Sequence, residues 1–129
     1  AYYSRYNFHY CAVNGDKNGN RELMIMSSII SHPDGNLTFS GDPIPLPKSG
    51  DIRLKVVVKD SQLQFYWAEK GGEWQKAGPV LDASILSDEC GGHAEHGSFT
   101  GAFVGMAAHD LNGSGRPADF AYFAYTPIR

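Results

Sequence analysis

The sequence predicts an all-β domain, an antiparallel sandwich, because its apolar residues alternate along the chain and turn residues recur at short intervals. The alternation is clearest at residues 52–59, where Ile, Leu and Val on one face alternate mainly with Arg and Lys on the other. Fifteen Gly and seven Pro among 129 residues supply many turns, and only residues 81–86 fit a turn of helix. A chain of this length forms one core, so we expect a single β-sandwich domain over residues 1–129.

A hairpin is expected in the middle of the chain. Asp60 and Ser61 form a tight turn, after which Leu63, Phe65 and Trp67 alternate with polar neighbours. Residues 70–73 make the next turn, and Trp74 opens a short strand. Three further strands are expected upstream, at residues 8–13, 22–31 and 37–40. Proline at every second residue from Pro43 to Pro47 confines that stretch to an extended edge or a connection.

The last two strands are expected at residues 99–108 and 118–125, joined by a turn at 111–115 that is rich in Gly and Asn. Aromatic residues at alternate strand positions usually fill the core of a sandwich. We therefore expect four aromatic core residues, which are Phe65, Trp67, Phe103 and Phe120.

Composition excludes some partners. The net charge is −3, whereas nucleic acid and anionic membranes both select a basic surface, so neither is expected as a partner. No apolar run approaches the roughly 20 residues of a membrane span. Two cysteines, Cys11 and Cys90, do not make a disulfide framework; we expect two free thiols, and a single disulfide between them is the alternative. Nothing in the sequence separates a cytoplasmic from a secreted location.

Two segments resemble metal sites, but each has a simpler interpretation. Residues 16–22 carry oxygen ligands at alternate positions like a calcium loop, but Arg21 stands where such a loop needs glycine, so a hairpin turn is expected. His93, Glu95 and His96 lie close together in the sequence, although the surrounding glycines deny them a rigid support. We expect no metal and no cofactor.

No catalytic centre is evident from the residues alone. Hydrolysis of a glycoside needs two carboxyl groups on opposite sides of the sugar, and no spacing among the Asp and Glu residues singles out such a pair. Aromatic rings are the remaining lead, since sugars stack their C–H faces on Trp and Tyr. The candidates for surface stacking are Tyr6, Tyr66 and Trp74.

Several motifs resemble those of one family. Residues 78–89 (GPVLDASILSDE) are similar to the signature segment of the C-terminal domain of glycoside hydrolase family 43 β-xylosidases. Residues 99–106 (FTGAFVGM), 109–113 (HDLNG) and 118–123 (ADFAYF) follow in the family's order. Upstream, Tyr2-Tyr3, residues 8–10 (FHY) and residues 63–67 (LQFYW) also match. The resemblance spans essentially the whole chain.

The resemblance implies a concanavalin-like jelly roll appended to a catalytic propeller that hydrolyses xylo-oligosaccharides. The parent protein would then be a β-xylosidase, while this segment alone is not an enzyme, because the catalytic carboxylates lie on the propeller. In the family, a loop of this domain helps close the sugar pocket with an aromatic residue. That loop corresponds to residues 88–99, which gives Phe99 as the closing ring, with His93 and His96 beside it.

Family domains carry more strands upstream of the position of Tyr2, so the resemblance implies that the jelly roll in this chain is without its N-terminal strands. An incomplete sandwich leaves an open edge and a bare apolar face. The expected partners are therefore the missing strands and the propeller of the same protein, a xylo-oligosaccharide, and further copies in a homo-oligomer. Three roles remain open: an accessory domain of a β-xylosidase, an independent xylan-binding module, and a structural oligomerisation domain.

Overall fold

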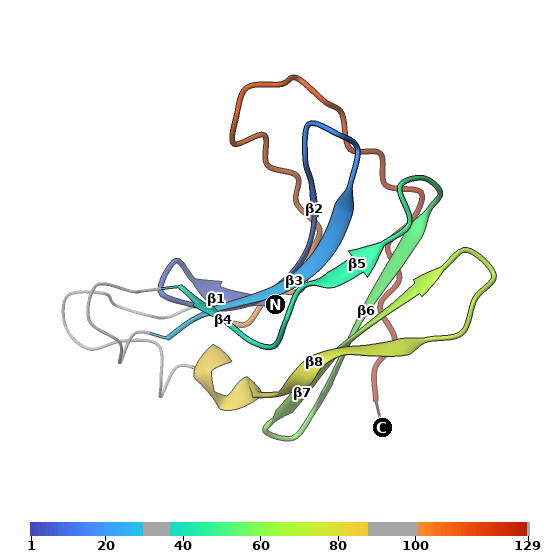
Figure 1. Ribbon diagram of the computed structural model, residues 1–129. Helices are drawn as coiled ribbons and strands as arrows, with labels where there is room; N and C mark the ends of the chain where they lie inside the picture. The colour runs from blue at the N-terminus through green and yellow to red at the C-terminus, as the bar shows by residue number, and fades with distance from the viewer. Residues whose placement is uncertain (30–36, 88–100, 129) are drawn as a thin grey trace.

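The computed structural model describes residues 1–29, 37–87 and 101–128. Two antiparallel sheets face one another across a shared core, which confirms the all-β sandwich class (Figure 1). The first sheet has strand order β1-β2-β3-β4, with β5 also paired to β3, and the second has order β6-β7-β8. Among the described residues, no helix is long and apolar enough to cross a membrane.

The first sheet is built around a long hairpin. β2 (Asn7–Gly15) and β3 (Arg21–Ser28) pair along their full length, with Ile25 opposite Cys11. β1 (Tyr2–Ser4) adds to β2, and β4 (Thr38–Phe39) and β5 (Ile44–Leu46) add to β3. The proline-rich stretch is therefore a short edge strand, as expected from its missing backbone N–H groups.

The second sheet is the predicted hairpin extended by one strand. β6 (Ile52–Lys59) and β7 (Gln62–Glu69) pair from Ile52 opposite Glu69 to Lys59 opposite Gln62. Asp60 makes the tight turn with φ of 54°, a left-handed conformation that Asp tolerates and that two-residue hairpins need. β8 (Gln75–Asp82) runs on through the signature segment, and the 3-10 helix η2 (Ala83–Leu86) is the predicted helical turn.

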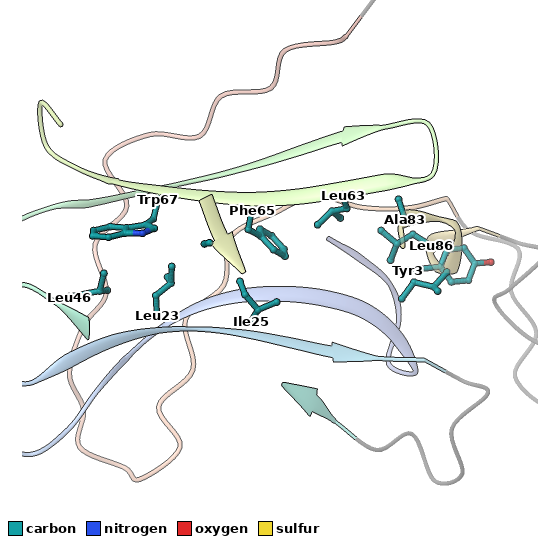
Figure 2. Close-up of a cluster of buried hydrophobic side chains, with 11 residues drawn as sticks. Tyr3, Leu23, Ile25, Leu46, Leu63, Phe65, Trp67, Ala83 and Leu86 are labelled. Carbon is teal, nitrogen blue, oxygen red and sulfur yellow. The ribbon is translucent and has the colours of Figure 1, made fainter. Parts of the chain in front are cut away.

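The core lies between the sheets. Side chains from β3 and β5 meet those of β7, with Leu23, Ile25 and Leu46 on one side and Leu63, Phe65 and Trp67 on the other (Figure 2). Phe65 and Trp67 are buried, as the alternation predicted. Tyr3 and the apolar residues of η2 close one end of this core.

The prediction for the C-terminal strands was wrong for the residues that the structure describes. Residues 101–108 and 118–125 contain no strand, and only an isolated bridge links Phe103 to Tyr2. Phe103 and Phe120 are 59% and 52% exposed, so neither is a core residue. The physical reason is that a strand needs a neighbouring edge to pair with, and alternation alone does not supply one.

Candidate functional site

Two buried polar side chains of β2 join the first sheet to the end of the second. The Asn7 side chain donates from Nδ2 to the backbone oxygen of Ile85 at 2.8 Å. The His9 ring lies 2.8 Å from the backbone oxygen of Asp82 through Nε2. Together they hold η2 at its N-cap and within the helix, and the Asp82 carboxylate also accepts from the backbone N–H of Ser84. The segment that ends at residue 87 is therefore anchored to both sheets.

The hydrogen bonds of His9 define its tautomer. A backbone oxygen only accepts, so Nε2 carries the proton and donates to Asp82. Nδ1 then accepts from the Ser27 hydroxyl at 2.7 Å. Burial lowers the pKa of His9 below its ordinary value of 6.5, although the bond to Asp82 opposes that shift. Neutral His9 thus connects the two sheets by hydrogen bonds. We call Asn7 and His9, with these bonds to Ile85 and Asp82, the clamp.

The stability of this clamp is expected to depend on pH. The folded state holds His9 with a lowered pKa, so below about pH 6.5 the unfolded chain takes up a proton first and the free energy of unfolding falls. His9→Gln should reduce this slope, which urea unfolding between about pH 8 and about pH 5 would measure; the rest of the slope comes from the Ala1 amino group, whose pKa burial lowers to about 6. His109→Gln, at an exposed position, is the matched control. An identical slope in the His9 variant would show that another group causes it.

The outward face of the second sheet brings two of the predicted stacking residues together. Lys55 Nζ lies 4.6 Å from the ring centroid of Tyr66 and 4.4 Å from that of Trp74. Arg53 Cζ lies 4.7 Å from the centroid of Trp74. Arg53 also donates from Nη2 to the backbone oxygens of Gly72 and Glu69, at 2.6 and 3.2 Å. The two rings and two cations therefore form one connected row on a fixed turn.

The remaining predicted site residues lie elsewhere. Tyr6 belongs to the turn between β1 and β2, on the other sheet, where Arg5 covers its ring at 4.6 Å and donates to its hydroxyl. Figure 1 places this turn and the β7–β8 turn on opposite sides of the molecule. Three predicted pocket residues, Phe99, His93 and His96, lie outside the described residues. Tyr6 is therefore not part of the Tyr66–Trp74 row.

Carboxylates that the sequence offered for metal binding or catalysis shape turns instead. Asp16 accepts from the backbone N–H groups of Asn18 and Asn20, as a hairpin turn requires. Asp110 accepts from the backbone N–H groups of Ser114 and Gly115. The pKa of Asp16 is lowered by hydrogen bonds from the Asn20 side chain and from the backbone N–H groups of Asn20 and Asn18, and that of Asp110 by its bonds from Gly115 and Ser114, whereas a general acid needs a raised pKa. In the described part of the chain no cluster of His, Cys, Asp and Glu could hold a metal ion.

Cys11 carries a free thiol, as predicted. Burial raises the pKa of Cys11 to about 12, so the thiol is protonated and unreactive at neutral pH. Cys90 lies outside the described residues. Cys11 therefore acts as a small apolar residue beside the core.

The outward face of the first sheet is apolar. Leu23 and Ile25 point into the core, so their neighbours Met24 and Met26 point outward. Met26 pairs with Tyr10 on β2 and with Phe39 on β4, and Phe39 is 56% exposed. An apolar face of this kind is typical of a surface that another protein segment covers.

Comparison with known proteins decides the family. Residues 1–126 match the model of the β-xylosidase C-terminal concanavalin A-like domain. The chain belongs to this family. The match covers the clamp, the signature segment and the C-terminal motifs, and it confirms the resemblance predicted from the sequence.

The relatives are much longer than this domain. The chain is 54% identical over 133 residues to xylosidase/arabinosidase 43B of Humicola insolens, matching all of the chain and 24% of the relative. It is 29% identical to a xylan 1,3-β-xylosidase of Vibrio sp, over 97% of the chain and 22% of that protein. A β-xylosidase of Bacillus subtilis is 34% identical over 70% of the chain and 17% of its own length. The chain thus spans a quarter or less of these relatives.

Sequence reasoning missed the hydrogen bonds of Asn7 and His9 and the two cations, Arg53 and Lys55, that contact the rings of Tyr66 and Trp74. Asn7 and His9 are recognisable only after the two sheets are docked, because their partners lie at Ile85 and Asp82. The cations had a usable signal, since Arg and Lys alternate with apolar residues along β6.

Proposed function

We propose that this domain is an accessory domain of a β-xylosidase that acts on xylo-oligosaccharides, packing on the catalytic propeller and helping to close its sugar pocket. The observation that carries the proposal is the pinned end of the sandwich. Asn7 and His9 hold η2 by hydrogen bonds of 2.8 Å, and Ile85 and Leu86 are buried. A loop that narrows a pocket works only from a fixed base, because misplacement of about 1 Å is costly in catalysis.

Two uncovered surfaces support a partner segment. The outward face of the first sheet is apolar, and on the inner face of β6 Leu54 and Val58 are 43% and 39% exposed although they face the core side. β6 also ends its sheet without a second neighbour among the described residues. The propeller would cover the first surface, and upstream strands of the same protein would cover the second.

The test is a change of the proposed closing ring in the intact protein. Phe99→Ala should lower kcat/KM on xylobiose about tenfold, because the sugar loses an apolar wall in the transition state. Phe39→Ala, at an exposed ring on the outward face of the first sheet, should instead weaken docking and lower the unfolding temperature. Equal kcat/KM for the Phe99 variant and the parent protein would refute the pocket role.

The independent xylan-binding module is the second candidate, favoured by the placement of Tyr66 and Trp74 on one face. Titration of the domain with neutral xylo-oligosaccharides separates the two roles. Absence of binding, together with activity restored when the domain is added to its propeller, supports the accessory role. Binding by the domain alone would support the module.

A further inference from the structure

Basic side chains gather on the outward face of the second sheet. Alternation places Arg53, Lys55 and Lys59 of β6 on this face, and Lys76 of β8 joins them because it pairs with Tyr66. We call these four residues the cationic face. The chain as a whole carries a net charge of −3, so the positive charge of the cationic face is opposite in sign to the net charge of the domain.

A carboxylate at one end of the cationic face, that of Asp82, is engaged in hydrogen bonds to η2. Asp82 pairs with Gln62, which in turn pairs with Lys59, so it marks the end of the face. Hydrogen bonds from the side chain of Ser84 and from its backbone N–H, the latter at 2.9 Å, lower the pKa of Asp82. Asp82 therefore caps η2 as an ionised group.

A shallow hollow of about 180 Å³ lies on this face. Its apolar part comes from Val57 and Val80. Lys59 and Lys76 bring positive charge to it, and Tyr66 adds an aromatic ring. The hollow thus combines an apolar floor with cations, which suits a ligand that has both a C–H face and a negative charge.

Gln64 gives the hollow a fixed polar group. Its Nε2 lies 3.0, 3.2 and 3.0 Å from the backbone oxygens of Phe65, Ala77 and Gly78, so its two N–H groups share three acceptors. The amide is therefore held in one orientation, and its Oε1 is left to accept from a hydroxyl. A rigid acceptor beside an apolar floor favours a saccharide over a simple anion.

We propose that this hollow binds a saccharide bearing a carboxylate, such as a hexuronic acid branch on a xylo-oligosaccharide. The ring lies against Tyr66 and the two valines, a hydroxyl donates to Gln64, and the carboxylate faces Lys59 and Lys76. The choice of a xylose backbone rests on the proposed function, whereas the choice of a carboxylated sugar rests on the hollow itself.

Calorimetric titration of the intact protein tests the proposal. A xylo-oligosaccharide with a glucuronic acid branch should bind about five- to tenfold more tightly than the unbranched chain at low ionic strength. The preference should shrink as salt is added, because exposed charges are screened. Lys59→Gln with Lys76→Gln should abolish the preference and leave affinity for the neutral chain unchanged.

A variant with the same loss of charge elsewhere on the surface is the control. Lys17→Gln with Lys48→Gln removes equal charge at exposed positions away from this face and should preserve the preference. Equal affinity for both oligosaccharides in the parent protein would overturn the proposal, and so would a preference that survives in the Lys59/Lys76 variant. Competition by inorganic phosphate as strong as by glucuronate would reduce the hollow to a general anion site.

Free glucuronate and xylose separate this proposal from the accessory role. If the parent protein binds glucuronate and the Lys59/Lys76 variant does not, the proposed binding site is supported, even where Phe99→Ala leaves catalysis unchanged. If neither sugar binds at the hollow while Phe99→Ala lowers kcat/KM, the accessory role is supported and the proposed saccharide site is refuted.

Discussion

Leu63→Ala is expected to lower the free energy of unfolding by about 2–5 kcal/mol. Leu63 is fully buried on β7, between η2 and the strands of the first sheet, so its loss removes apolar contacts and leaves a cavity in the middle of the core (Figure 2). Urea unfolding followed by the fluorescence of the buried Trp67 would measure the loss close to the site.

The matched control is Leu111→Ala. Leu111 is 95% exposed, so the same chemical change should cost less than about 0.5 kcal/mol there. Similar losses at the two positions would contradict the sandwich core, because burial would then make no difference to the cost.

Gly78→Ala is expected to lower the free energy of unfolding by at least about 2 kcal/mol, for two reasons. Gly78 has φ of 69°, which alanine adopts only at a cost. A Cβ there would lie 2.9 Å from Cγ1 of Ile25, so the second sheet would have to move away from the first. Gln64, which donates to the Gly78 oxygen, would lose its fixed position as well.

Gly71→Ala isolates the backbone part of this cost. Gly71 has φ of 74° and no atom within 4 Å of a built Cβ, so its variant should lose about 1–2 kcal/mol. The difference between the two variants measures the contact with Ile25. No difference would show that Gly78 is required for its conformation alone.

The sequence was sufficient where the structure is local. Alternation placed the hairpin of β6 and β7, because both strands and the turn at Asp60 are consecutive in the chain. The same pattern predicted that Phe65 and Trp67 are buried. Pro45 correctly marked an edge strand.

The sequence failed where partners are distant. Residues 118–125 are rich in Phe and Tyr, which strands favour, but they form no strand in the described chain, and Tyr122 and Tyr125 are 63% and 73% exposed. Alternation reports which faces are apolar and says nothing about what covers them.

The candidate site divides in the same way. Tyr66 and Trp74 were recognised as aromatic residues, but their connection through Lys55 depends on the register of β6 against β7. The orientation of Gln64 depends on a bulge between Phe65 and Leu63, which leaves backbone oxygens of β8 for its amide. Neither register nor bulge follows from composition or spacing.

The bridge between Tyr2 and Phe103 sets an order of assembly. Each residue donates its backbone N–H to the other, at 2.8 and 2.7 Å, across about 100 residues of intervening chain. Contacts so far apart in sequence form late, after the hairpins have folded. At ordinary rates of translation, Phe103 is synthesised roughly 5–20 s after Tyr2. Over that interval the edge of β1 is unpaired and can pair with a neighbouring nascent chain. Slower translation should therefore increase the fraction of chains that associate through this edge.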